Sequence, residues 1–143
     1  ANYTFVDSEI VYCKSTSAPC TGTGTIVRDL VNLSKHAASG TLYYEDDKFS
    51  IRGTATYRDK YLLTVPTSRI DRDTGVNDVQ GAKSTLFVDL AASYQVTPQI
   101  QLRLEAQNIT NEALEYYYDS VRQDPYYTGF TGRKFSAGVA FKF

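Results

Sequence analysis

Residues 135–143, at the end of the chain, read Phe-Ser-Ala-Gly-Val-Ala-Phe-Lys-Phe. Side chains alternate between the two faces of a strand, so this stretch has one apolar face and one small or polar face. The apolar face comprises Phe135, Ala137, Val139, Phe141 and Phe143. The terminus of a soluble domain usually frays, which gives it little use for a last aromatic residue. A strand of a membrane β-barrel faces lipid and ends in an aromatic girdle, so the stretch favours a barrel strand.

The composition is that of an ordered protein of one ordinary domain. Of its 143 residues, 42% are hydrophobic and 22% are charged, which argues against disorder. The net charge is −1 and no basic run occurs, so no nucleic-acid partner is expected. No window approaches the length of an apolar transmembrane helix, a test that does not detect the alternating residues of barrel strands.

The sequence contains no methionine, and it begins at Ala1 without a secretory signal. We therefore expect it to be a piece of a longer chain.

The alternating pattern predicts long strands separated by unequal connections. The strands are expected at residues 1–12, 35–44, 48–61, 85–96, 100–108 and 135–143. Long polar loops are expected at 13–32, 64–83 and 111–132, and short turns at 45–48 and 97–99. Outer-membrane barrels have this alternation, with short periplasmic turns and long outer loops. We predict an all-β fold, an antiparallel up-and-down meander of about six long strands.

One face of the predicted strands carries no charge. Besides the last strand, it comprises Leu42, Tyr44, Phe49, Ile51, Gly53, Ala55, Tyr57, Leu86, Val88, Leu90, Ala92, Tyr94, Ile100, Leu102, Leu104 and Ala106. The opposite face holds Lys48, Arg52, Arg58, Asp89, Arg103, Glu105, Lys134 and Lys142. A soluble antiparallel sandwich also has alternating strands. Its strands average about 5–6 residues, however, whereas the longer runs here suit a tilted crossing of a bilayer.

Six groups of short motifs follow one another along nearly the whole chain. They are Asn-Tyr-Thr-Phe-Val-Asp-Ser-Glu at 2–9, Leu-Ser-Lys-His at 33–36 with Thr-Leu-Tyr-Tyr-Glu at 41–45, Thr-Tyr-Arg at 56–58, Val-Asp-Leu at 88–90, Leu-Glu-Ala-Gln-Asn-Ile-Thr-Asn-Glu at 104–112, and Gly-Arg-Lys-Phe at 132–135. In order and spacing they resemble the C-terminal end of TonB-dependent outer-membrane receptors.

That resemblance implies that residues 1–143 are the C-terminal six-strand segment of a 22-stranded transmembrane β-barrel in the bacterial outer membrane, the size of the plugged transporters. The plug domain and the remaining strands are not in this sequence. The family takes up scarce nutrients (a siderophore, an oligosaccharide or cobalamin) with energy delivered by TonB.

The implied partners are outer-membrane lipid, the TonB complex acting through the missing plug, a small-molecule nutrient, and the outer-membrane assembly machinery that reads the terminal Phe143. A soluble all-β binding module with an aromatic loop and a passive porin are the alternatives.

Two groups of residues are candidate sites. Cys13 and Cys20 are expected to form a disulfide that ties down the first long loop, as suits an oxidising compartment. The third long loop carries an aromatic set that can stack on and hydrogen-bond a polar ligand such as a sugar or a catecholate chelate. Its members are Tyr116, Tyr117, Tyr118, Arg122, Tyr126 and Tyr127. The alternative is that these aromatic residues only pack on their neighbours or on lipopolysaccharide.

No constellation typical of an enzyme, a metal site or a cofactor site is present. His36 is the only histidine, and it has no obvious acidic or sulfur partners. Residues 71–78 have some features of a calcium-binding loop but depart from the EF-hand pattern; we interpret them as a solvated polar loop, with calcium binding as the alternative. The sequence Asn108-Ile109-Thr110 matches a glycosylation signal, which we interpret as a chance match.

Overall fold

The computed structural model describes residues 1–14, 20–66 and 79–143. Regular structure in these ranges is almost entirely β-strand, with a single 3-10 turn at Gly22–Gly24. The strands are β1 (Asn2–Phe5), β2 (Ile10–Cys13), β3 (Thr25–Arg28), β4 (His36–Glu45), β5 (Phe49–Arg58), β6 (Tyr61–Thr64), β7 (Gln80–Ala82), β8 (Thr85–Thr97), β9 (Ile100–Gln107), β10 (Ala113–Tyr118), β11 (Asp124–Phe130) and β12 (Lys134–Phe141). Within the described ranges, no helix has the length and apolar character needed to cross a membrane.

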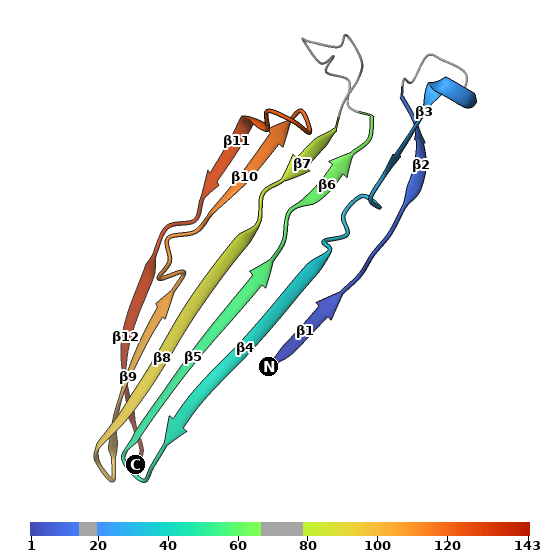
Figure 1. The fold of residues 1–143 in the computed structure, drawn as a ribbon. Helices are drawn as coiled ribbons and strands as arrows, with labels where there is room; N and C mark the ends of the chain where they lie inside the picture. The colour runs from blue at the N-terminus through green and yellow to red at the C-terminus, as the bar shows by residue number, and fades with distance from the viewer. Residues whose placement is uncertain (15–19, 67–78) are drawn as a thin grey trace.

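The largest unit is a six-stranded antiparallel sheet in the order β1-β4-β5-β8-β9-β12. Each strand of this sheet pairs with the strand of the sheet that follows it along the chain. The sheet is long and twisted (Figure 1). The predicted all-β antiparallel meander is therefore confirmed. The sheet is open, with β1 and β12 at its edges.

The two short turns at one end of this sheet are closed by polar side chains. In the β4–β5 turn, the Asp46 Oδ1 accepts hydrogen bonds from the backbone N–H groups of Lys48 (2.9 Å) and Phe49 (2.8 Å). These bonds favour the ionised carboxylate and lower the pKa of Asp46. In the β8–β9 turn, the Thr97 Oγ1 accepts from the N–H of Ile100 at 3.1 Å. Such local acceptors are the reason that Asp and Thr favour tight turns.

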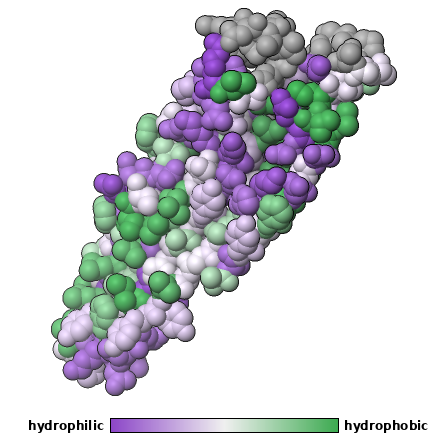
Figure 2. Space-filling view, viewed as in Figure 1, coloured by the Kyte–Doolittle hydropathy of each residue, from purple (hydrophilic) through white to green (hydrophobic). Residues whose placement is uncertain are grey.

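The pairing register places the predicted apolar set on one face. Residues directly opposite in antiparallel strands share a face, and one row across five strands is Tyr44, Ile51, Ala92, Leu104 and Ala137. The neighbouring row on the other face is Tyr43, Arg52, Ala91, Glu105 and Ser136. On the face seen in Figure 2, hydrophobic residues concentrate over the lower part of the sheet and hydrophilic residues dominate the upper part.

The long connections are not plain loops, which corrects the sequence expectation. They carry a four-stranded sheet in the order β11-β10-β7-β6 and a separate hairpin of β2 and β3. The expected first strand at 1–12 is divided into β1 and β2, and only β1 joins the main sheet. The expected third strand ends at Arg58, and β6 begins at Tyr61 in the second sheet. Tyrosine, leucine and isoleucine in these segments favour strands, and local pairing overrides their polar flanks.

The most buried apolar residues lie in and beside the four-stranded sheet. Val79 is 1% exposed, Ala82 is 3% and Tyr117 is 3%. Tyr117 lies opposite Gly81 across β10 and β7. A Cβ atom built on Gly81 would lie 2.5 Å from the Tyr117 Oη and 2.9 Å from its Cε1. The glycine therefore provides the space in which the tyrosine ring is buried.

Asn108 joins the two sheets at the end of β9. It has a left-handed φ of 53° and is 6% exposed. Its Nδ2 donates to the Glu112 carbonyl (3.0 Å), the Thr131 Oγ1 (3.2 Å) and the Gly132 carbonyl (3.2 Å). Its Oδ1 accepts from the N–H of Glu112 at 2.8 Å. One side chain thus connects the end of β9 to the start of β10 and to the passage from β11 to β12.

The close approach at Gly81 predicts the effect of adding a side chain there. Gly81→Ala should lower the free energy of unfolding by about 1–3 kcal/mol, because the buried Tyr117 ring must shift. Gly40→Ala is the matched control, since Gly40 also lies in a strand and a Cβ atom there meets nothing within 4 Å. Denaturant titrations of both variants measure the difference. Equal stability of the two variants would contradict this packing.

The Asn108 bonds predict that an isosteric change is costly. In Asn108→Asp the carboxylate cannot donate to its three acceptors, and each part-buried hydrogen bond lost costs about 0.5–1.5 kcal/mol. Asn111→Asp is the control, because Asn111 has a similar φ of 55° and its side chain is exposed. Unfolding midpoints should fall clearly for the first variant and little for the second. An unchanged midpoint for Asn108→Asp would show that the junction does not depend on these bonds.

Candidate functional site

Four of the tyrosines predicted as a ligand site form a continuous aromatic cluster on β10 and β11. The ring centroids of Tyr118 and Tyr126 are 4.2 Å apart and stacked, and those of Tyr116 and Tyr127 are 5.2 Å apart and stacked. Tyr116 and Tyr126 complete the cluster at 6.2 Å. The register of β10 against β11 shifts between Tyr116 and Tyr117, which gives β11 the extra residue Tyr126. The bulge is what lets two tyrosines of β11 contact two of β10.

Tyr117 does not belong to this cluster. Neighbouring residues of a strand point to opposite faces, and the Tyr117 ring lies over Gly81 in the interior. The run Tyr116-Tyr117-Tyr118 therefore serves two purposes: two rings belong to the cluster and the middle one is part of the core. Tyr126 and Tyr127 are 37% and 50% exposed, so the cluster presents aromatic surface to its surroundings.

Arg122, also predicted as a ligand residue, is placed in the turn between β10 and β11. Its Nε lies 3.4 Å from the Asp119 Oδ2. The Asp119 Oδ1 accepts from the N–H groups of Val121 (2.7 Å) and Arg122 (3.1 Å). Asp119 is 9% exposed and has a left-handed φ of 72°. Through these contacts Arg122 helps to hold the turn between β10 and β11.

The electrostatics of the cluster centre on Tyr126. Burial raises the pKa of its hydroxyl, and the neighbouring Tyr118 and Tyr116 raise it further. The folded protein thus favours the neutral phenol, which can both donate and accept a hydrogen bond.

The two cysteines of the first long connection are joined. A disulfide links Cys13 to Cys20, with a Cα–Cα distance of 5.0 Å. Cys13 is the last residue of β2, which pairs with β3. The disulfide therefore forms a short covalent loop next to this hairpin. Among the described residues there is no free cysteine.

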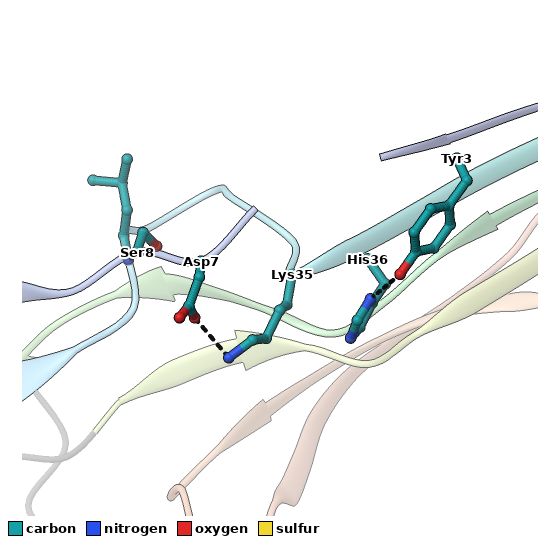
Figure 3. Close-up of polar contacts among 6 residues, drawn as sticks. Tyr3, Asp7, Ser8, Lys35 and His36 are labelled. Atoms are coloured by element: carbon teal, nitrogen blue, oxygen red, sulfur yellow. Dashed lines mark hydrogen bonds and ion pairs between the residues drawn. The ribbon is translucent and has the colours of Figure 1, made fainter. Parts of the chain in front are cut away.

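The edge strand β1 is held to the main sheet by side chains as well as by backbone pairing (Figure 3). The Lys35 Nζ lies 2.7 Å from the Asp7 Oδ1, and this hydrogen bond raises the pKa of Lys35. The Tyr3 hydroxyl and the His36 Nδ1 are 2.7 Å apart and hydrogen-bonded. His36 is thus engaged by an aromatic residue of the edge strand.

The residues expected to mark the closing strand lie in or just after β12 on the exposed apolar face. Phe135 is 73% exposed, Val139 53%, Phe141 62% and the terminal Phe143 is fully exposed. β12 pairs with β9 along its whole length. Beside Phe135 the face has an apolar depression of about 390 Å³ where Ala92, Ala106 and Ala137 leave room between larger side chains.

The opposite face of the main sheet is polar and shallowly grooved. Two grooves of about 200 and 160 Å³ both have Arg52 and Glu105 in their lining. The Ser136 Oγ donates to the Glu105 Oε2 at 3.4 Å, and the Arg103 Nε donates to the Gln101 Oε1 at 3.0 Å. These contacts fit a hydrated surface of mixed charge.

Among the described residues, no group of three or more His, Cys, Asp or Glu side chains could hold a metal ion. Residues 71–78, considered above for calcium, lie outside the described ranges.

Two residues important to this region did not stand out in the sequence. Asn108 looked like part of a glycosylation signal, but its amide is buried in the junction of the two sheets. Arg58 looked like one more charge on the polar face. Its Nε donates to the Ser34 Oγ (2.8 Å), its Nη2 donates to the Asn32 carbonyl (2.9 Å), and its guanidinium lies 3.7 Å above the centre of the Tyr61 ring. A clue to Asn108 was its position at the end of the strand predicted at 100–108.

Comparisons with known proteins find no significant match to a family model, to a curated protein or to a solved structure.

The raised pKa of Tyr126 predicts a change in stability at alkaline pH. Because the folded state holds this proton more tightly, its contribution is complete below the usual tyrosine pKa of about 10 and is lost as the pH rises through the higher folded value. The stability of the unmodified chain should therefore fall more steeply above pH 10 than that of Tyr126→Phe, as measured by denaturant titration at a series of pH values. Tyr43→Phe, which removes a hydroxyl at a 74% exposed position, is the matched control. Parallel curves for the chain and for Tyr126→Phe would contradict this assignment.

Proposed function

We propose that this chain is a wall segment of a TonB-dependent outer-membrane receptor, with its apolar face against lipid and its polar face toward the lumen of a 22-stranded barrel. The observation that carries the proposal is the exposed, uncharged face that runs unbroken across the paired strands of the main sheet. Leu42 (84% exposed), Leu104 (59%) and Phe135 (73%) belong to this face.

A face of this kind is unfavourable in water. Monomeric soluble proteins rarely expose a contiguous apolar patch of more than a few hundred Å², whereas a bilayer makes the same surface favourable. Each long strand alternates between this face and a charged one, as lumen-facing and lipid-facing residues do in a barrel wall. The open edges at β1 and β12 fit further strands on both sides, because unpaired strand edges are otherwise prone to association.

The proposed orientation puts the short β4–β5 and β8–β9 turns on the periplasmic side. The second sheet and the β2–β3 hairpin then project outward, beyond the membrane, where a disulfide persists. In this arrangement the tyrosine cluster on β10 and β11 is available to a nutrient ligand, of the siderophore, oligosaccharide or cobalamin class. The remaining partners are lipid, the TonB complex through a plug domain, and the machinery that assembles outer-membrane proteins.

The soluble binding module is the second candidate, and the exposed tyrosines are the observation in its favour. The two proposals differ in their need for detergent. A wall segment should remain dispersed only in detergent or lipid, whereas a soluble module should be a monodisperse monomer in plain buffer. Size-exclusion chromatography with and without detergent separates them.

The orientation of the faces predicts unequal effects for two matched substitutions in β9. In the receptor folded into lipid vesicles, Leu104→Arg should lower the free energy of unfolding by about 2–4 kcal/mol, because it places a charge against the middle of the bilayer. Gln107→Arg introduces the same side chain on the opposite face of the same strand and should have a small effect. Reversible unfolding with denaturant measures both.

A soluble module gives a different outcome. Leu104 is already exposed, so in that case Leu104→Arg would be neutral or would improve solubility. A neutral Leu104→Arg in vesicles therefore contradicts the membrane-wall proposal.

A further inference from the structure

A cleft of about 310 Å³ lies where the β2–β3 hairpin, the start of β6 and the β10–β11 turn come together. It does not include the tyrosine cluster, because the tyrosine of the run 116–118 that lines it is Tyr117, which points to the other face of β10. Its volume is at the lower end of the range of small-molecule sites, about 300–1,000 Å³.

The interior of the cleft is apolar and buried. Val79 and Tyr117, which are 1% and 3% exposed, line it together with the half-buried Leu62. Apolar side chains at the bottom of a cleft favour a ligand that carries an apolar group of its own.

Its remaining lining carries opposite charges in equal number. Glu9 and Asp29 are the carboxylates, and Arg28 and Lys60 are the cations. Glu9, Asp29 and Lys60 are exposed, and Arg28 is half-buried. None of the four forms an ion pair with another residue of the described ranges; the Arg28 Nη1 donates only to the Val27 carbonyl, at 3.2 Å. Both signs of charge are therefore left for a bound molecule.

The backbone around the cleft is fixed by hydrogen bonds. The Tyr12 hydroxyl donates to the Asp29 carbonyl (3.2 Å), and the Asn32 N–H donates to the Leu62 carbonyl (2.6 Å). On the other side, the Asp119 N–H donates to the Val79 carbonyl at 3.1 Å. These bonds tie the hairpin to β6 and the β10–β11 turn to Val79, and such ordered backbone reduces the reorganisation that binding requires.

We propose that this cleft binds a zwitterion of about dipeptide size with an apolar side chain. Its ammonium group pairs with Glu9 and Asp29, its carboxylate pairs with Arg28 and Lys60, and its side chain contacts Leu62, Val79 and Tyr117. Charge-assisted hydrogen bonds are stronger than neutral ones, which is why balanced, unpaired charges favour a zwitterion over a neutral sugar. As a nutrient site the cleft rests on the proposed function, but binding can be measured without transport.

The test is calorimetric titration of the detergent-solubilised receptor with L-alanyl-L-phenylalanine, with its N-acetylated, C-amidated form and with maltose. The free dipeptide should bind, and the doubly blocked peptide should bind at least about a hundredfold more weakly, because it loses two charge-assisted contacts. Maltose should bind more weakly than the free dipeptide. No binding of the dipeptide, equal binding of its blocked form, or tighter binding of maltose would overturn the proposal.

Two charge-removing variants locate the ligand. Lys60→Gln and Asp29→Asn should each weaken dipeptide binding by about tenfold or more and leave the affinity of the blocked peptide unchanged. Lys48→Gln, in the turn at the far end of the sheet, is the matched control and should leave dipeptide affinity unchanged. Equal affinities of Lys60→Gln, Asp29→Asn and Lys48→Gln would show that the dipeptide binds elsewhere. None of these outcomes changes the expected effect of Leu104→Arg on folding in vesicles, so the two proposals fail independently.

Discussion

The antiparallel register of the six-stranded sheet is the constraint on which the rest of the structure depends. The side-chain period of a strand is two, so a slip of one residue would move every apolar side chain to the opposite face. The register places Tyr44 beside Ile51 and Leu104 beside Ala137, and it brings Arg52, Glu105 and Ser136 into one row on the other side. It is fixed at one end by the turns at Asp46 and Thr97, whose side chains accept backbone hydrogen bonds. A single continuous apolar face, and with it the proposed membrane wall, follows from this pairing.

The passage from the main sheet to the second one depends on side chains that bond to backbone. At Asn108 the left-handed backbone ends β9. Its side-chain amide then donates to the carbonyl of Glu112, just before β10, and to the carbonyl of Gly132, just before β12. At Arg58 the guanidinium connects the end of β5 to the Asn32 and Ser34 segment that precedes β4. Buried polar groups need hydrogen-bond partners, and here these partners lie at the points where the chain leaves or enters the main sheet. The passages between the two sheets are therefore ordered by polar contacts, whereas each sheet is ordered by strand pairing.

Whether the sequence could predict a feature of this arrangement depends on how far apart in the chain the interacting residues lie. The alternation in 85–96 and 100–108 is a local signal, so the six strands and their apolar face could be predicted. The strands β10 and β11 were not predicted, because they form a bulged hairpin within a segment whose polar residues resemble a loop, and because β10 also pairs with the distant β7. The predicted cluster was divided for the same reason: Tyr117 takes the opposite face, and its burial depends on the absence of a side chain at Gly81. The cleft combines residues as far apart in sequence as Glu9 and Gln123, which no spacing rule would bring together.

The division of the tyrosines has a consequence for how the outer region works. A strand that buries one ring and directs its two neighbours to the other face has a fixed orientation, since rotating it would expose Tyr117, which is only 3% exposed. The half-buried rings of Tyr116 and Tyr118 are thereby held on the cluster face by a residue that is not itself part of the cluster. The same buried ring forms part of the cleft on the other face. Two surfaces with different chemistry, one aromatic and one of balanced charge, thus depend on a single buried side chain, and a change in its packing would alter both.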